Sequence, residues 1–404
     1  MGEAQMTVGH VEGTTSATAR LTAGVGHSEL SDARSAGAEA TAAAVRQLDT
    51  APALILVYAA RRYDSVELLA GVRAEAKDAD VVGATADEFF ADGATWLSEN
   101  AAVAVLALSA GPYRFGIGST ADTETDQARV AAAVTRQARE NAGGGLGYAA
   151  ALVLGDDNNS RHQQLLTGVH QVAGATVPIV GGGFGDYRLL DRTALYHNDR
   201  ILESGMVVVW IESPHPLTVS VAHGWEPSGL PQLITAADDT YVEEIEGRPA
   251  LEVLHDQFPE LARGSGAVAD PSAAMPWAFG LGLIEPDGAQ FIRGFVIEDG
   301  ERMRMHTALP AFAAIQFVRA SPTSLLGINE KVVREAVGDR EVGAVIVFSC
   351  VGRLRVLGDR AAEEAEGVHD AAGVPSLGMF SYGEFARVSG ITGYHNSTVV
   401  ALAL

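Results

Sequence analysis

The sequence predicts an α/β protein with mixed sheets, arranged as two domains in which sheet packs on sheet and helices lie outside. Two observations carry this prediction: one building block occurs three times, and its strands are apolar on both faces. The block runs strand, helix, glycine turn, strand, strand, and its later part occupies residues 80–108, 177–211 and 374–404. Internal repetition on this scale indicates a duplicated architecture.

The apolar strands decide how the layers are stacked. Residues 103–108, 206–211, 345–348 and 398–404 are apolar at nearly every position. A strand of this kind is covered on both faces. Because the chain offers fewer helical segments than strands, helices can cover one face and a second sheet must cover the other. The pattern favours layered mixed sheets over a parallel nucleotide-binding sheet.

The first part of the chain is expected to form one domain of two similar halves. Residues 1–18 have the composition of a mobile tail. The domain then spans residues 19–233, with its halves at 53–118 and 149–224. In each half a buried strand leads into a helix with one apolar face, and a hairpin follows the glycine turn.

Local signals place the elements of this domain. Ser31 or Asp32 is expected to cap an alanine-rich helix that runs to about Leu48. The strands that open the two halves are expected at residues 53–60 and 149–154. The remaining helices are expected at residues 65–77, 125–141 and 163–172.

Residues 234–404 are expected to form the second domain. Strand candidates joined by proline and glycine turns occupy residues 277–284, 291–297, 302–307 and 315–319. A helix over 322–337, a strand over 343–350 and a helix over 359–371 then lead into the third glycine-turn segment.

Composition excludes several classes of protein. The chain has 404 residues, 47% of them hydrophobic, and a formal net charge of −23. A chain this acidic is disfavoured as a nucleic-acid binder, because phosphate neutralisation needs clustered basic residues. The single cysteine excludes an internal disulfide. Neither a signal-peptide pattern nor a membrane-length apolar run occurs, so we expect a cytoplasmic protein that does not contact membranes.

Several motifs resemble the FIST family, in which an N-terminal and a C-terminal FIST domain occur together. The motifs are Val-Val-Gly (81–83), Val-Pro-Ile-Val-Gly-Gly (177–182), Phe-Ser-Cys-Val-Gly-Arg (348–353), Phe-Ser-Tyr-Gly-Glu-Phe (380–385) and Tyr-His-Asn-Ser-Thr (394–398). The resemblance covers residues 53–404. It implies a sensory module for a small ligand, with amino acids as suggested ligands, and some family members resemble haem-dependent nitric-oxide sensors.

The first candidate site is the aromatic–glycine–acid step of Tyr382, Gly383 and Glu384. Glu384 suits a ligand ammonium group, and Tyr382 suits a planar ligand. Arg353, expected at a strand end, could clamp a carboxylate, so that Arg353 and Glu384 together would bind a zwitterion. Two plainer interpretations remain: Glu384 accepts backbone hydrogen bonds at a turn, or the two side chains pair with each other.

The second copy of the repeat offers two related residues. The glycines at 181–183 resemble a phosphate loop, but no helix start follows them, so a tight turn between packed sheets is favoured. Gly182 could still let a ligand approach the backbone, and Asp186 is expected to hold the place of Glu384.

Histidines supply the haem alternative. His395 and Asn396 precede the last strand of their copy, as a His–Asn pair at residues 197–198 does in the second copy. Recurrence at one repeat position favours a turn with a left-handed asparagine, although an imidazole there could ligate haem iron. His223, beside Trp225, is a second candidate ligand to haem iron. No spacing of histidines supports another metal site.

Cys350 could act as a nucleophile if a histidine approached it, but a buried, inert thiol is favoured. The sequence thus predicts a stand-alone sensory protein without catalytic activity that binds an amino-acid-like ligand in or between its domains. Its signal would pass to a separate protein, and the chain could form a homo-oligomer. The alternatives are a haem-based gas sensor and a cysteine-dependent hydrolase or transferase.

Overall fold

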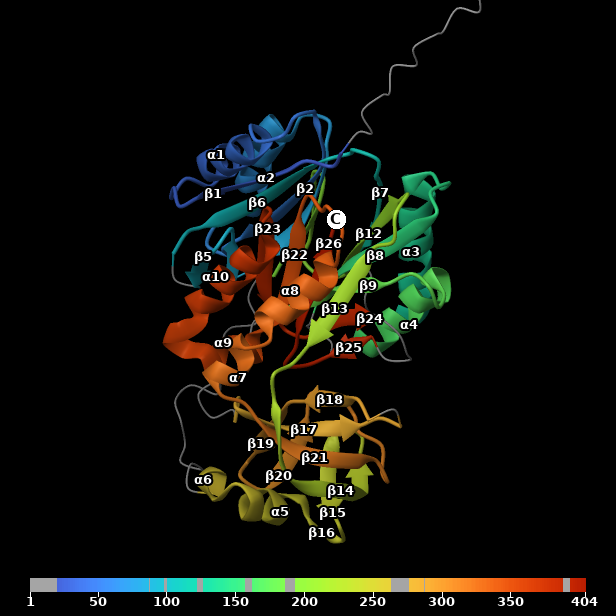
Figure 1. Ribbon diagram of the computed structural model, residues 1–404, viewed down its shortest axis with the longest axis vertical. Helices are drawn as coiled ribbons and strands as arrows, with labels where there is room; N and C mark the ends of the chain where they lie inside the picture. The colour runs from blue at the N-terminus through green and yellow to red at the C-terminus, as the bar shows by residue number, and fades with distance from the viewer. Residues whose placement is uncertain are drawn as a thin grey trace, which may run out of the picture.

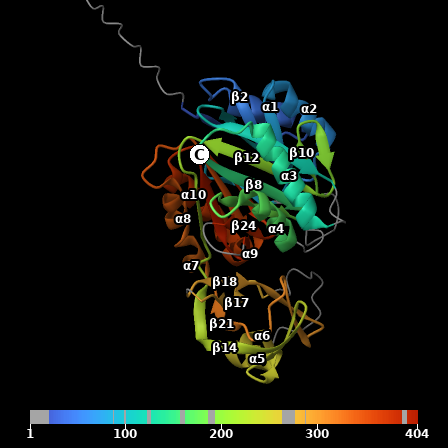
Figure 2. The ribbon, with the colours of Figure 1, turned by 90° about the vertical axis from the view of Figure 1, so that its right-hand side faces the viewer.

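The structure is a computed structural model that describes residues 20–86, 88–97, 100–121, 126–156, 162–185, 193–262, 276–286, 288–387 and 393–404. The expected tail, residues 1–18, lies outside the described residues. The described chain forms a large body made of three sheets and a smaller lobe below it (Figure 1, Figure 2). The prediction of a mixed α/β fold with internally repeated units is confirmed.

Three successive units build the large body. The elements of the first unit are β1 (Ala23–Ser28), α1 (Ala33–Val45), β2 (Pro52–Ala59), α2 (Ser65–Ala76), β3 (Asp80–Thr85), β4 (Glu88–Ala91), β5 (Ala94–Leu97) and β6 (Val103–Ser109). Those of the second are β7 (Arg114–Thr120), α3 (Gln127–Ala142), β8 (Tyr148–Asp156), α4 (His162–Ala173), β9 (Ile179–Phe184), β10 (Leu195–His197), β11 (Arg200–Leu202) and β12 (Met206–Ser213).

The third unit follows the same order but is interrupted. It consists of β13 (Thr218–Ala222), α7 (Pro322–Leu326), α8 (Asn329–Val337), β22 (Val345–Cys350), α9 (Val351–Leu357), α10 (Ala361–Ala372), β23 (Ser376–Ser381), β24 (Glu384–Arg387), β25 (Tyr394–His395) and β26 (Val399–Ala403). The lobe is inserted between β13 and α7. The predicted domain boundary between residues 233 and 234 falls inside a strand of the lobe and stays a prediction.

The lobe is one antiparallel sheet flanked by two short helices. Its elements are β14 (Glu226–Asp238), β15 (Tyr241–Ile245), β16 (Arg248–Pro249), α5 (Ala250–Gln257), α6 (Pro259–Ala262), β17 (Phe279–Ile284), β18 (Gln290–Arg293), β19 (Phe295–Glu298), β20 (Arg302–Met305) and β21 (Ala314–Arg319). The ring of Phe258 contacts those of Phe279 and Phe317 in its core.

The units exchange hairpins, so that each sheet contains strands from two units. In sheet β1-β6-β2-β3-β10-β11 the hairpin comes from the second unit. In sheet β7-β12-β8-β9-β24-β25 it comes from the third, and in sheet β13-β26-β22-β23-β4-β5 it comes from the first. Each sheet contains one parallel pair of strands, which is β2 with β3 in the first sheet, β8 with β9 in the second and β22 with β23 in the third. The other pairings within these three sheets are antiparallel.

One aromatic side chain anchors each exchanged hairpin. Phe90, Tyr196 and Phe385 lie opposite the glycines of β23, β3 and β9. All three aromatic side chains are fully buried, and each belongs to the apolar cluster beneath the helices of the sheet that receives its hairpin. Burying a side chain of this size contributes about 2–3 kcal/mol.

Glycine is required in the strands that receive the hairpins, because the chains approach too closely for a side chain. A Cβ atom at Gly378 would lie 2.2 Å from the ring of Phe90. A Cβ atom at Gly83 would lie 2.0 Å from the backbone oxygen of Val57 on the neighbouring strand. Gly378 is therefore required by the packing of the exchanged hairpin, and Gly83 by the close approach of the parallel strand β2.

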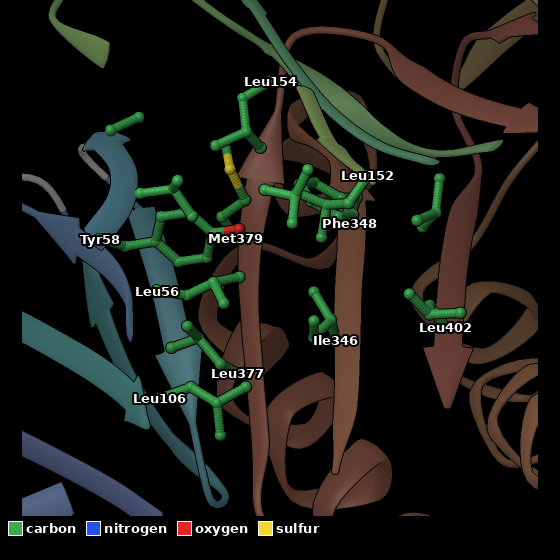
Figure 3. Packing of buried hydrophobic residues seen from close by; sticks show 14 of the residues in the cluster. Leu56, Tyr58, Leu106, Leu152, Leu154, Ile346, Phe348, Leu377, Met379 and Leu402 are labelled. Atoms are coloured by element: carbon green, nitrogen blue, oxygen red, sulfur yellow. The ribbon is translucent and has the colours of Figure 1, made fainter. Parts of the chain in front are cut away.

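The three sheets face one common core. Leu56 and Tyr58 of β2, Leu154 of β8, Phe348 of β22 and Met379 of β23 converge there (Figure 3). Helices cover the outer faces: α1 and α2 on the first sheet, α3 and α4 on the second, and α8, α9 and α10 on the third. This arrangement confirms the prediction of sheet-on-sheet packing with outer helices. Among the described helices, none is long and apolar enough to cross a lipid bilayer.

Replacing the anchor of an exchanged hairpin is expected to destabilise the fold. We expect Phe90→Ala to lower the free energy of unfolding by about 3–5 kcal/mol, because it leaves a cavity under α10. Phe312→Ala, which truncates a phenylalanine that is 74% exposed, is expected to change it by less than about 0.5 kcal/mol. Denaturant titrations of both variants check this. Equal decreases in the free energy of unfolding in Phe90→Ala and Phe312→Ala would show that burial of Phe90 does not hold the hairpin.

Candidate functional site

A cavity of about 250 Å³ lies between the lobe and the third unit of the large body. Trp277, Phe279, Phe295, Arg304 and His306 line it from the lobe, and Cys350, Tyr382, Tyr394, Asn396 and Ser397 line it from the third unit. The cavity lies where the parallel strands β22 and β23 end. The carboxyl ends of parallel strands are a common place for ligand sites, because the following loops diverge there.

Cys350 is the last residue of β22, and α9 begins directly after it. Its thiol donates a hydrogen bond to Glu384, and its sulfur accepts hydrogen bonds from the backbone N–H groups of Gly352 and Ser397. Burial and the neighbouring Glu384 carboxylate raise the pKa of the thiol well above its usual value. The sulfur therefore carries a proton at neutral pH and lies against a proton acceptor.

Glu384 lies behind the thiol and is fully buried. Its Oε1 accepts a hydrogen bond from Ser381 Oγ at 2.8 Å, and its Oε2 accepts from Thr398 Oγ1 at 2.9 Å and Thr398 N at 3.2 Å. Burial raises the pKa of the carboxyl group to about 7, although these hydrogen bonds act in the opposite direction. A carboxyl group with this pKa can accept and return a proton near neutral pH.

The position of Glu384 is apolar in the other two exchanged hairpins. Glu384 pairs with Gly182 of β9, whereas the corresponding residues Leu195 and Phe89 pair with β3 and β23 and lie in the common core. A buried carboxyl group at a core position costs free energy unless it has a task. The comparison within the chain therefore makes Glu384 a candidate functional residue.

His395 lies across from Glu384 on β25, at a position that also is apolar in the other units. The corresponding residues are Trp96 and Leu202, which both lie in the common core. The His395 Nε2 atom lies 2.9 Å from the carbonyl oxygen of Ala386, to which it can donate. Burial lowers the pKa of His395 to about 4, so the ring is neutral at pH 7.

The expectation that the two His–Asn pairs occupy one repeat position is wrong. His197 ends β10, the first strand of its hairpin, whereas His395 lies on β25, the second strand of its own. Asn198 takes the predicted left-handed conformation with φ 54°, but near His395 the left-handed residue is Ser397 with φ 63°. The two pairs have the same sequence, but they lie on different strands of their hairpins.

Arg353 is not among the residues that line the cavity, so the prediction that it binds a ligand carboxylate is wrong. The side chain lies in α9, not at a strand end, and is fully buried. Its guanidinium group donates to Ser349, His223, Leu325, Asn329 and Glu364. Arg353 pairs with Glu364 at 3.3 Å and does not form the expected pair with Glu384. It holds α7, α8 and α10 together beneath the site.

Other predicted residues are distributed between the wall and its surroundings. Tyr382, Gly383 and Asn396 line the cavity. Gly383 has φ 115°, and a Cβ atom there would lie 2.6 Å from the ring of Tyr394. Gly182 lies behind the wall, where a Cβ atom would lie 2.7 Å from that of Ser381. Asp186 falls outside the described residues.

Asn396 lines the cavity and has an unused hydrogen-bond acceptor. Its Nδ2 donates to Tyr394 Oη at 3.2 Å. Its Oδ1 is buried and has no partner among the described residues, and the side chain is only 7% exposed. Because buried acceptors are nearly always satisfied, this oxygen indicates a donor supplied by a ligand or by water.

The histidines chosen as haem ligands do not fit that role. His223 Nδ1 accepts a hydrogen bond from the backbone N–H of Trp225 at 3.0 Å. The described wall of the cavity includes neither His223 nor His395. A volume of about 250 Å³ is at the lower end of pockets for small ligands, and haem is larger than such ligands. Within the described residues no group of three potential metal ligands occurs.

The lobe's contribution to the site was missed from the sequence. Trp277, Arg304 and His306 belong to strand and loop segments that have no counterpart in the other units. The available signal was the interruption itself: the third unit separates β13 from its helices by about 100 residues of unrelated sequence, an insertion placed directly before the segment that carries Cys350.

Comparisons with known proteins show the family of the chain and leave the activity open. The model of the FIST N domain matches residues 53–248, and that of the FIST C domain matches residues 250–387. An uncharacterized protein of Mycobacterium tuberculosis is 28% identical over 395 residues, which are 93% of this chain and 97% of that protein. An uncharacterized protein of Mycobacterium bovis is 27% identical over 227 residues, 54% of this chain and 58% of that protein. A crystal structure of cyanuric acid hydrolase from A. caulinodans matches with 11% identity and a TM-score of 0.33, covering 95% of this chain and 99% of that one.

Replacing Glu384 should change how stability depends on pH. The pKa of this carboxyl group is about 7 in the folded chain against an ordinary 4.5. The stability that its protonated form contributes is complete below pH 4.5 and is lost as the pH rises towards 7. The loss is on the order of 3 kcal/mol. The free energy of unfolding of the wild type, minus that of Glu384→Gln, is therefore expected to fall across this window.

Urea titrations at a series of pH values measure this difference. Glu212→Gln, which removes another buried carboxyl group, serves as the control. Its free energy of unfolding is expected to change with pH between 4.5 and 7 as that of the wild type does, because Glu384 is still present. Parallel curves for the wild type and Glu384→Gln would contradict the raised pKa.

Proposed function

Because this chain belongs to the FIST family, with an N domain followed by a C domain, we propose that it is a sensory protein that binds a small ligand between its lobe and its third unit. FIST domains are small-ligand sensory domains. The observation that carries the proposal is the Oδ1 atom of Asn396, a residue of the cavity wall, which is buried and has no hydrogen-bond partner among the described residues. A buried acceptor without a donor is costly, and a ligand N–H group would relieve that cost.

An amino-acid-like ligand suits the chemistry of this cavity. The Arg304 side chain lines the cavity from β20 and is oriented by Glu298, whose Oε1 lies 3.3 Å from its Nε. A guanidinium group in this position can bind a ligand carboxylate. Asn396 would accept from the ligand's ammonium group on the opposite wall. Phe279 and Phe295 supply apolar surface for a side chain between them.

Binding across this cavity would link two parts of the molecule. The lobe joins the large body through short connections at residues 223–225 and 320–321, so its orientation can respond to a ligand held by both sides. We propose that a separate signalling protein in the cytoplasm binds the form of the protein that holds the ligand. A homo-oligomer whose contacts change with the orientation of the lobe is a second way to pass on the signal.

Two arginines on one strand allow a matched test of the ligand class. Arg304 lines the cavity, whereas Arg302 stacks on Tyr241 and bonds to Glu243 away from it. Calorimetric titration with a panel of free amino acids is expected to give a Kd that rises at least about tenfold in Arg304→Gln, because a charge-assisted hydrogen bond is lost. Arg302→Gln is expected to bind as the wild type does.

Native mass spectrometry of the purified protein complements the titration, since it detects a small molecule that stays bound during purification. A panel in which no amino acid binds would contradict the proposed ligand class. Equal affinities of Arg304→Gln and the wild type would contradict the assigned binding mode.

A further inference from the structure

Non-covalent binding leaves one feature of the cavity unexplained. The chain's single thiol, on Cys350, forms part of the wall, and a buried carboxyl group lies directly behind it. A site that only holds a ligand needs neither group. A thiol hydrogen-bonded to a buried carboxylate is the arrangement of a nucleophile and the base that activates it.

Burial and Glu384 keep the sulfur protonated, so it can act as a nucleophile only if Glu384 takes the proton during the attack. The Gly352 and Ser397 N–H groups donate to the sulfur atom, which stabilises negative charge on sulfur once the proton has left. A Cβ atom at Gly352 would lie 3.6 Å from Sγ and 3.7 Å from both Ser397 Oγ and the ring of Trp277. The space beside the thiol therefore has room for about one methyl group at this point, and Trp277 of the lobe bounds it.

The other two units lack this pair, so it does not belong to the fold as such. Val57, Val153 and Val347 occupy one position in the three units, because each pairs with the glycine of the neighbouring parallel strand. Three residues further along, Cys350 of the third unit corresponds to Ala60 in the first and Asp156 in the second. The residues that correspond to Glu384 are apolar, as described above. Both members of the pair occur in the unit that carries the lobe, and only there among the described residues.

We propose that Cys350 is the nucleophile of an acyl-transfer reaction in this cavity, that Glu384 takes the thiol proton, and that the acyl donor is a small amino-acid-like ester or carboxamide. The inference rests on the cavity of the proposed function and adds chemistry to it. The unpartnered Asn396 Oδ1 is a separate observation that points to a ligand, because it would accept an N–H of the donor and hold its carbonyl group near Sγ.

The reaction balances with the groups present. Glu384 accepts the S–H proton while Sγ forms a bond to the carbonyl carbon, and the bond from that carbon to the alkoxy or amino group breaks. The leaving group takes the proton from Glu384, and a thioester remains on Cys350. Water then attacks the thioester and gives a proton to Glu384. The S–C bond breaks, the free acid leaves, and the proton returns to sulfur.

The pH dependence identifies the base. The charged or titratable groups around the pair are His395, which pairs with Glu384 on β25, and Arg304, His306, Tyr382 and Tyr394 on the wall of the cavity. Arg293 and His223 lie near His395. Burial lowers the pKa of His395 and of His306 to about 4, so neither ring changes charge near pH 7. An inflection near pH 7, with the rate rising as pH rises, would therefore report ionisation of Glu384, whose pKa is about 7.

The test uses the full chain and p-nitrophenyl acetate as acyl donor, with intact-protein mass spectrometry and release of nitrophenolate as readouts. Because Cys350 is the only cysteine, an acetyl group that the wild type gains and Cys350→Ser does not is assigned to its sulfur. We expect the wild type to gain one acetyl group in a burst and Cys350→Ser to lose that burst. Glu384→Gln is expected to slow acetylation about 100-fold or more and to remove the inflection near pH 7. Glu384→Asp is expected to restore part of the rate, and the control Glu212→Gln to react as the wild type does.

The outcomes separate this inference from the proposed function. Wild-type protein that is not acetylated at Cys350, or acetylation at equal rates in the wild type and Glu384→Gln, overturns the inference. If Glu384→Gln does not fold, as judged by circular dichroism, a wild-type rate that is independent of pH from about 6 to 8 overturns it instead. Amino-acid binding that persists in an unreactive protein removes only the acyl-transfer step and leaves the sensory proposal intact.

Discussion

The burial of one aromatic side chain from each exchanged hairpin is the interaction on which the rest of the structure depends. Phe90, Tyr196 and Phe385 each leave their own unit and pack beneath the helices of another. These contacts close the three sheets around a common core, which no single unit could build alone. Because side chains alternate along a strand, these contacts also direct the residues next to each aromatic anchor towards the common core. Because Phe385 faces outwards over β9, Glu384 must face inwards, towards the end of β22.

This constraint explains how a repeated fold can carry a single site. In the first two hairpins the inward positions hold apolar residues that fill the core. In the third they hold Glu384 and His395. The core at that end is interrupted, and the inserted lobe covers the opening with aromatic and cationic side chains. Divergence of one unit and insertion of a lobe beside it have together changed a packing position into a cavity with a thiol, a carboxyl group and an unsatisfied amide oxygen.

Much of this fold could be predicted from the sequence. The repeated glycine segments and the uniformly apolar strands gave mixed sheets, sheet-on-sheet packing and outer helices, because those patterns depend on local burial. The exchange of hairpins could not be predicted, since the pairing of Glu384 with Gly182 joins residues about 200 positions apart and each hairpin is as compatible with its own unit as with the next. The misassignment of Arg353 has a similar cause: Ser-Cys-Val-Gly-Arg follows an apolar run and predicts a strand end, yet α9 starts at Val351 and turns the guanidinium group inwards. Tyr382, Gly383 and Asn396, which the repeated motifs single out, line the cavity. Tyr382 and Gly383 follow the end of β23, and Asn396 precedes β26.

The most direct test of the account is a crystal structure of the protein grown with the amino acid that binds most tightly. The account predicts ligand density between Arg304 and Asn396 and next to Cys350, with β24 paired to β9. Ligand density elsewhere on the molecule, or a third hairpin that pairs within its own unit, would contradict it.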